Sequence, residues 1–126
     1  MRQHIETDGA PTAVGPYSQA IATGELVFCA GQVGFDPATG SMVEGGIEAQ
    51  SERVLTNLGA VLDAAGSDFA NVLKTTCFLT DLADFAAFND VYRRYFPEPY
   101  PARSTFAVAG LPGGALVEIE AIAARR

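Results

Sequence analysis

Clustered apolar residues predict extended segments in the first two thirds of the chain. Between Ala20 and Gln32, two short apolar runs are separated by a turn signal at positions 23–25, and this pattern predicts a hairpin. The segment from Val72 to Leu79 is rich in β-branched and aromatic residues, which favour a strand.

A second hairpin is predicted towards the end of the chain. Arg103 to Val108 and Leu116 to Ala123 have extended patterns, and they flank a glycine- and proline-rich segment at 110–114. Apolar and polar residues alternate along the second of these strands. Its apolar side chains can therefore pack beneath helices while its other face carries chemistry or meets a partner subunit.

Two segments have the three- and four-residue spacing of an amphipathic helix. In the first, apolar residues recur between Ile47 and Ala65, and Gly66 follows where a C-terminal cap is expected. In the second, they recur between Phe85 and Phe96, after which two prolines end the pattern. Each helix has a single apolar face, so both are expected on one sheet.

The order of strands, helix, strand, helix and hairpin predicts a single α+β domain. The chain of 126 residues fits one domain over 1–126 and leaves little for a second. Because both helices cover the same face, the other face of the sheet is expected to be uncovered. A small domain with this arrangement often completes its burial by forming an oligomer.

The composition of the chain argues against nucleic acid and membranes as partners. With 15 acidic and 8 basic residues the formal net charge is −7, and no long basic patch occurs, so nucleic acid is an unfavourable partner. A buried positive site can still attract a small anion, because burial strengthens a single charge. No apolar run approaches the roughly 18 residues of a membrane span, and the first residues do not resemble a signal peptide, so we expect a cytoplasmic protein.

The cysteines and the histidine do not indicate a metal site. Cys29 and Cys77 lie inside apolar runs, which is typical of reduced, buried strand residues, although spacing alone leaves a disulfide open. His4 is the only histidine, and with two separated cysteines it does not give the spacing of metal ligands.

Candidate chemistry lies on the predicted C-terminal hairpin. Alternation places Arg103 and Thr105 on one face of their strand, and Glu118 and Glu120 on one face of the other. With the turn at 110–113, Thr105 would lie opposite Glu118, and Arg103 opposite Glu120. The hairpin would then present a guanidinium, a hydroxyl and carboxylates together.

This set of groups suits binding a carboxylate and activating a water. A planar guanidinium binds a carboxylate through two parallel hydrogen bonds, a hydroxyl can position a water, and a carboxylate can exchange its proton. A cross-strand salt bridge on a solvated face explains the same residues at least as well. Tyr17, directly after the turn signal Gly15-Pro16, can cover a pocket or simply pack at a strand start.

Short motifs are spread over nearly the whole chain. They are Gly15-Pro16-Tyr17-Ser18-Gln19-Ala20, Ala30-Gly31-Gln32, Glu48-Ala49-Gln50, Asn57-Leu58, Ala64-Ala65-Gly66, Lys74-Thr75-Thr76, Asp84-Phe85-Ala86, Asn89, Val91-Tyr92, Tyr95-Phe96, Pro101-Ala102-Arg103-Ser104, Leu111-Pro112 and Glu118-Ile119-Glu120-Ala121-Ile122-Ala123. None is specific alone. In this order and spacing, the chain resembles the Rid (RidA/YjgF) family.

The resemblance implies a chorismate-mutase-like α+β fold, with a mixed sheet of about six strands and both helices on one face. It also implies a homotrimer with a central barrel and active sites in the clefts between subunits. The implied activity is hydrolytic deamination of reactive 2-imino or enamine acids, such as 2-iminobutanoate and 2-iminopropanoate, to 2-keto acids and ammonia. No cofactor is implied.

The resemblance also implies roles for single residues. Arg103 would hold the substrate carboxylate, Glu118 would work with the attacking water, and Tyr17 would line the pocket. Gly31 would offer backbone contacts, and Asn89 would belong to the structure that supports the cleft.

One position departs from the family pattern. Two residues after the arginine the family often has cysteine, and this chain has Thr105. A hydroxyl also donates and accepts hydrogen bonds, so we expect Thr105 to hold the attacking water. The substitution leaves the preferred imine open.

Other functions remain open from the sequence. The substrate could be another enamine acid, such as aminoacrylate or aminomuconate, and a non-catalytic binder of small carboxylates would also use Arg103. A ribonuclease activity, sometimes attributed to relatives, is disfavoured by the net charge of −7 and by the lack of histidine at the predicted site.

Overall fold

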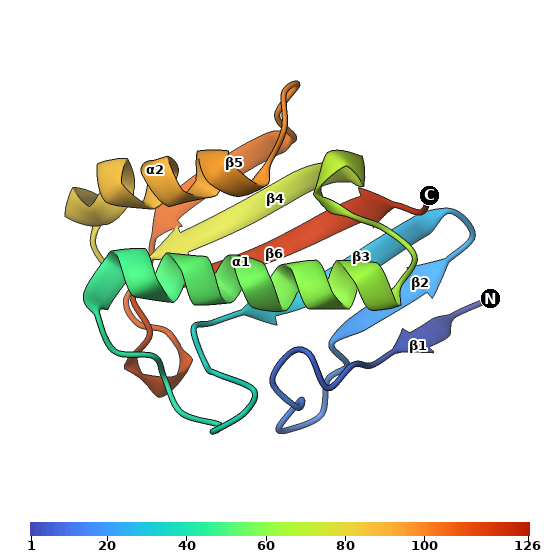
Figure 1. The fold of residues 1–126 in the computed structure, drawn as a ribbon, viewed down its shortest axis with the longest axis horizontal. Helices are drawn as coiled ribbons and strands as arrows, with labels where there is room; N and C mark the ends of the chain where they lie inside the picture. The colour runs from blue at the N-terminus through green and yellow to red at the C-terminus, as the bar shows by residue number, and fades with distance from the viewer.

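A six-stranded sheet carries both long helices on one face (Figure 1). The computed structural model describes residues 1–126. Across the sheet the strands are β1 (Gln3–Ile5), β2 (Ala20–Thr23), β3 (Leu26–Gln32), β6 (Val117–Ala124), β4 (Val72–Leu79) and β5 (Ala102–Ala107), and the helices are α1 (Gly46–Ala64) and α2 (Phe85–Tyr95). Only β4 and β5 run parallel, so the sheet is mixed, as the family resemblance implied.

The elements that were predicted from local sequence signals alone are confirmed. β2 and β3 form the first predicted hairpin, with Thr23 opposite Leu26, and β4 covers the predicted segment. Gly66 lies just past α1 with a φ of 78°, and its N–H and that of Ser67 return to carbonyls of the last turn at 3.0 and 2.8 Å. The glycine therefore closes α1 as expected. β1, which has only three residues, was not predicted.

The predicted C-terminal hairpin is wrong. β5 and β6 are not neighbours, because β4 lies between them. β5 instead pairs in parallel with β4, and α2 makes the crossover that such a pair needs. Four residues of β6 are buried, whereas β5 has no fully buried residue. β6 therefore takes a central place between β3 and β4, and β5 lies at the edge.

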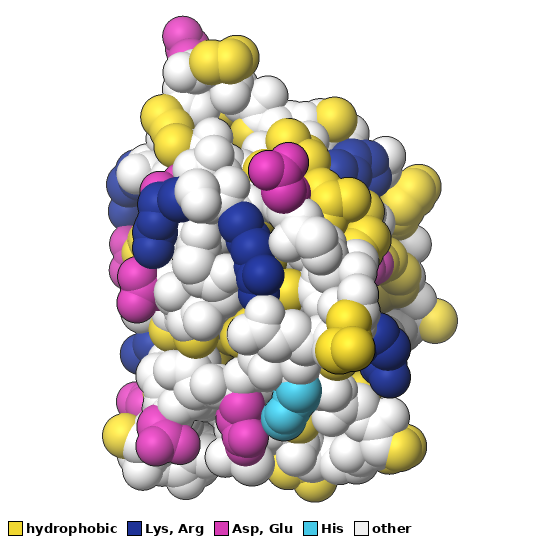
Figure 2. All heavy atoms as spheres, turned by 90° about the vertical axis from the view of Figure 1, so that its right-hand side faces the viewer, with side chains coloured by type: hydrophobic (Ala, Val, Ile, Leu, Met, Phe, Trp, Pro, Cys, Tyr) yellow, Lys and Arg dark blue, Asp and Glu magenta, His cyan; other side chains and the backbone are white.

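The core fills the space between the sheet and the helices, and the opposite face of the sheet is uncovered. Leu26, Phe28 and Phe106 project from that face with 37%, 44% and 52% of their surface exposed. Figure 2 views the molecule from one end and shows hydrophobic atoms gathered along its right-hand side, where the uncovered face is seen edge-on. The uncovered face expected from the sequence is therefore present, and much of it is apolar.

Both cysteines are buried with free thiols, as expected. Burial raises the pKa of Cys29 to about 12 and, with smaller opposing effects from its neighbours, that of Cys77 to about 11. Neither thiol is therefore ionised near neutral pH, which is the state that reacts. The helices include none with the length and apolar character that crossing a membrane requires.

Candidate active site

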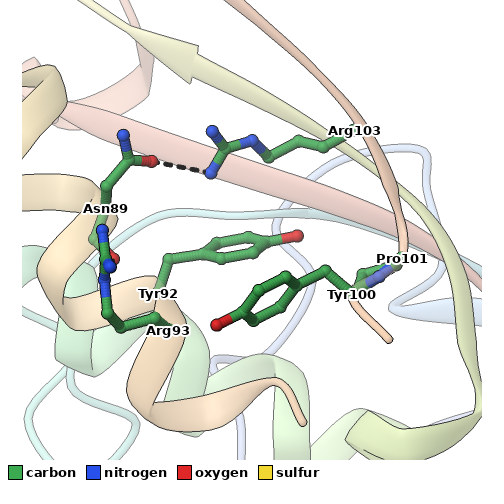
Figure 3. Close-up of a pocket in the computed structure, with 6 residues that line it drawn as sticks. All are labelled: Asn89, Tyr92, Arg93, Tyr100, Pro101 and Arg103. Carbon is green, nitrogen blue, oxygen red and sulfur yellow. Dashed lines mark hydrogen bonds between the residues drawn. The ribbon is translucent and has the colours of Figure 1, made fainter. Parts of the chain in front are cut away.

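Arg103 lies on the edge strand β5, and α2 holds its guanidinium. Nη1 donates a hydrogen bond of 2.8 Å to Asn89 Oδ1 (Figure 3). The guanidinium carbon lies 4.8 Å from the ring centre of Tyr92, 5.4 Å from that of Phe85 and 5.8 Å from that of Phe88. Aromatic faces attract a cation, so one amide and three rings fix the side chain.

The four residues that hold Arg103 share one face of α2. Positions 85, 88, 89 and 92 have the spacing that brings helical side chains together. Tyr92 is fixed in turn, because its hydroxyl shares a buried hydrogen bond of 2.7 Å with Thr75 of β4. The helix therefore places a rigid surface beneath the guanidinium.

The guanidinium has no carboxylate partner in this chain, since none of the salt bridges involves Arg103. The cross-strand salt bridge considered from the sequence is therefore not formed. Apart from the N–H bound to Asn89, the guanidinium keeps further donors for a ligand.

Thr105, two residues further along β5, has a buried Oγ1 without a hydrogen-bond partner. The thiol of Cys77 on the adjacent strand lies close enough to interact with this hydroxyl weakly. A stronger hydrogen-bond partner, such as a water, would contribute about 0.5–1.5 kcal/mol. Arg103 and Thr105 share one face of β5, as alternation predicted.

A pocket of about 300 Å³ opens beside Arg103. Its walls are Asn89, Tyr92, Arg93, Tyr100, Pro101 and Arg103, and Figure 3 shows the rings of Tyr92 and Tyr100 side by side within it. Sequence reasoning placed Tyr92 in the helix core, where its ring does pack. Tyr100 was not predicted as a site residue, because the prolines that end the helical pattern mark only a break before it.

Glu118 lies on the opposite face of the sheet from Arg103. Arg103 is in register with Thr75, and Thr75 with Ala121, so this row faces the helices. Glu118 is in register with Phe78 in the alternate row, which faces away. The shared face predicted for the guanidinium and the carboxylate is therefore wrong within one chain, because β4 intervenes and sets a different register.

Gly31 lies directly beside Glu118. A Cβ at Gly31 would come within 1.8 Å of Glu118 Oε2, so this position leaves room for the carboxylate only because it is glycine. The pairing of β3 with β6 shifts between Cys29 and Gln32, a bulge that contains Gly31. The backbone contacts expected of Gly31 stay a prediction, and the structure adds this close approach.

Tyr17 is 54% exposed and belongs to a second, more open pocket on the uncovered face. That pocket has a volume of about 600 Å³, and its walls include Ile21 and Phe28 of the first hairpin, together with Ala30 next to Gly31. The predicted site residues therefore form two groups. Arg103 and Thr105 lie on the helix-facing side at the β5 edge, while Tyr17, Gly31 and Glu118 belong to the uncovered side.

Electrostatics distinguish Glu118 from an ordinary surface carboxylate. Partial burial, and then the negative charge of Glu120, raise its pKa above the usual range. Such a carboxyl exchanges a proton closer to neutral pH than an exposed glutamate does. No group of three or more His, Cys, Asp or Glu side chains is arranged to hold a metal ion.

Known proteins match this chain over nearly its whole length. The family model described as endoribonuclease L-PSP matches residues 7–125. A 2-iminobutanoate/2-iminopropanoate deaminase of Capra hircus is 50% identical over 98% of this chain and 90% of its own length. The chloroplastic Reactive Intermediate Deaminase A of Arabidopsis thaliana is 51% identical over 97% of this chain and 65% of its own length.

Solved structures of similar proteins superpose on nearly the whole chain. RidA from an Antarctic Psychrobacter species superposes with a TM-score of 0.94 at 49% identity, covering 97% of this chain and 98% of that one. TdcF of E. coli, solved with bound serine, superposes with a TM-score of 0.93 at 42% identity, covering 98% and 99%.

The raised pKa of Glu118 predicts how stability depends on pH. Because the folded carboxyl keeps its proton to higher pH than the unfolded one, raising the pH through the window between the two pKa values destabilises the native state. Glu118→Gln removes this penalty. The free energy of unfolding of the variant, relative to wild type, should therefore increase as the pH rises from about 4 to 7.

Urea unfolding at fixed protein concentration across this pH range measures the difference. Glu25→Gln, which also removes one negative charge but from an exposed position, is the control for the loss of a single charge. A Glu118→Gln difference that is constant with pH would show that the native carboxyl titrates like an unfolded one.

Proposed function

The chain belongs to the Rid family, and from that premise we propose that it hydrolyses 2-imino acids such as 2-iminobutanoate and 2-iminopropanoate to 2-keto acids and ammonia. The observation that carries the proposal is the state of Arg103. Its guanidinium is fixed by Asn89 and Tyr92, has no carboxylate partner in the chain, and borders a pocket. A guanidinium held in this way can bind a substrate carboxylate through two parallel hydrogen bonds.

The mechanism needs positioning and proton transfer. With the carboxylate bound to Arg103, the C=N carbon is fixed, and the unpaired hydroxyl of Thr105 can hold a water near it. Glu118 takes a proton as the water oxygen bonds to that carbon and passes it to the nitrogen, which gives a carbinolamine. It then takes the proton of the new hydroxyl group and passes it to the same nitrogen. As the C–N bond breaks, ammonia leaves and the carbon keeps the oxygen as a ketone. Within one chain, partial burial raises the pKa of Glu118, and a neighbouring guanidinium would act in the opposite direction; the carboxyl can accept and return a proton in both steps.

This mechanism requires two copies of the chain, because Arg103 and Glu118 lie on opposite faces of one sheet. The two groups can meet if the β5 edge of one subunit abuts the uncovered face of the next near Gly31. Such a contact joins two different surfaces, and repeated contacts of this kind can close into a ring. The exposed apolar residues Phe28 and Phe106 favour burial of this face. We propose that the ring is a homotrimer, as the family resemblance implies.

Two further properties complete the proposal. Free thiols at Cys29 and Cys77 fit a reducing compartment such as the cytoplasm, where we propose that the protein acts. The ribonuclease activity in the description of the family model is disfavoured, because the net charge of −7 repels a phosphate backbone.

Arg103 variants test the activity. With threonine dehydratase as the source of imine and semicarbazide as the trap, wild type should speed 2-ketobutyrate formation and lower the semicarbazone yield. Arg103→Ala should lose turnover by about a hundredfold or more, since the clamp contributes two charge-assisted hydrogen bonds. Arg103→Lys should rescue little, because an ammonium does not reproduce the fork.

The control is Arg94→Ala, which removes an exposed arginine that pairs with Glu52 instead. It should retain wild-type turnover. An unchanged semicarbazone yield with wild-type protein across several imines would refute the deaminase proposal and favour a non-catalytic carboxylate binder.

Mixing two inactive variants tests whether the site is shared. Arg103→Ala and Glu118→Gln should each be inactive alone. In rings assembled from equal amounts, a site is intact when the arginine side comes from the second variant and the glutamate side from the first. With random assembly, each side of a site comes from the required variant in half of the cases, so about a quarter of the sites are intact. About a quarter of wild-type turnover should therefore return.

The native mass is measured on the same samples. It should be about three times the 13.2 kDa of the chain by light scattering. No recovery of turnover in rings shown to be mixed would place both residues in one subunit and contradict the shared site.

Thr105 variants test the water-holding hydroxyl. Thr105→Val keeps the branched shape but removes the hydrogen-bonding group, so turnover should fall by about tenfold to a hundredfold. Thr105→Ser should retain more activity. Removing a buried, unpaired hydroxyl should also leave Thr105→Val at least as stable as wild type in urea unfolding. A valine variant as active as wild type would mean that Thr105 only fills space.

A further inference from the structure

The pocket beside Arg103 contains a second arginine. Arg93 and Arg103 both form its walls, and both contact Asn89 (Figure 3). Arg103 Nη1 donates to the side-chain oxygen of Asn89 at 2.8 Å, and Arg93 Nε donates to its backbone oxygen at 3.3 Å. Two guanidinium groups are therefore held against a single residue, at the border of one pocket.

The charges of these two arginines are poorly neutralised within the chain. Arg103 has no salt bridge, and the only carboxylate near Arg93 is that of Asp90, at 3.8 Å and with 71% of its side chain exposed. A loose, exposed pair of this kind contributes little. The adjacent Arg94 differs, because Nη1 lies 2.8 Å from Glu52 Oε1. The pocket therefore carries two positive charges that a doubly charged anion would neutralise.

The walls of the pocket match the rest of such a ligand. Its volume of about 300 Å³ exceeds what an acid of three or four carbons occupies. The rings of Tyr92 and Tyr100 form a largely apolar wall, against which methylene groups can pack. A short aliphatic chain with a carboxylate at each end combines these requirements.

We propose that Arg93 makes this site selective for 2-imino acids that carry a second carboxylate, such as 2-iminosuccinate and 2-iminoglutarate. Arg103 binds the carboxylate next to the imine, and Arg93 binds the distal one. The inference rests on the proposed function, because it assigns the substrate class of the same site. The chemistry is unchanged: water adds to the C=N carbon, the nitrogen leaves as ammonia, and both carboxylates are retained.

Binding of the stable keto acid products tests the selectivity without turnover. Titration calorimetry on the assembled protein at low ionic strength compares 2-ketoglutarate with 2-ketobutyrate. Wild type should bind 2-ketoglutarate about tenfold more tightly, the effect of one added charge-assisted hydrogen bond. In Arg93→Gln, which keeps a polar side chain but removes the charge, this preference should fall to about one.

The matched control is Arg94→Gln on the same helix, which should keep the wild-type preference because Arg94 is paired with Glu52 away from the pocket. A wild-type preference near one, or one that Arg93→Gln leaves unchanged, overturns the proposal. Equal losses in Arg93→Gln and Arg94→Gln also overturn it, because they would trace the preference to overall surface charge.

A parallel turnover assay separates this proposal from the one on which it rests. If wild type hydrolyses 2-iminobutanoate but shows no preference for 2-ketoglutarate, the proposed function stands and the dicarboxylate selectivity fails. If it hydrolyses neither 2-iminobutanoate nor 2-iminoglutarate, both proposals fail.

Discussion

The packing of α2 against β4 and β5 is the interaction on which the candidate site depends. The same aromatic face that buries Phe88 in the core also supports the guanidinium of Arg103. Tyr92 joins the two layers, because its ring lies beneath the guanidinium while its hydroxyl is bonded to Thr75. The orientation of the cation is thus fixed by residues that also stabilise the fold, and a change that loosens α2 would disturb both.

The second constraint is the separation of the two faces of the sheet. One face is closed by helices and leaves Arg103 accessible only at its edge, whereas the other is open and carries Glu118 next to Gly31. Neither face contains all the groups that the proposed mechanism uses. Assembly is therefore tied to chemistry in the proposed mechanism, and the apolar open face gives that assembly a driving force.

The sequence predicted those parts of the fold that depend on local pattern. Both helices, the first hairpin and β4 follow from spacing and turn residues, and Gly66 acts as the expected cap because only its own backbone conformation matters. The neighbour of β5 could not be predicted in this way. Strand order depends on how much apolar surface each strand buries, and a turn signal at 110–114 carries no information about the strand that comes between.

The same distinction applies to the site. Alternation correctly put Arg103 with Thr105, and Glu118 with Glu120, but it cannot relate the faces of strands that do not touch. Asn89 was expected near the cleft only from the family resemblance, and nothing in the local sequence marked Tyr100. The α2 residues that contact Arg103 can be identified only when the position of α2 on the sheet is known.

The two buried cysteines have a consequence for chemical durability. Imines and enamines are reactive compounds, and an ionised thiol is the side chain most readily modified by electrophiles or oxidants. Burial holds Cys29 and Cys77 in the protonated form, with pKa values of about 12 and 11. At the position beside the guanidinium, a hydroxyl that does not undergo such oxidation takes the place of a sulfur atom. Neither cysteine is therefore a ready target for electrophiles or oxidants in the proposed site.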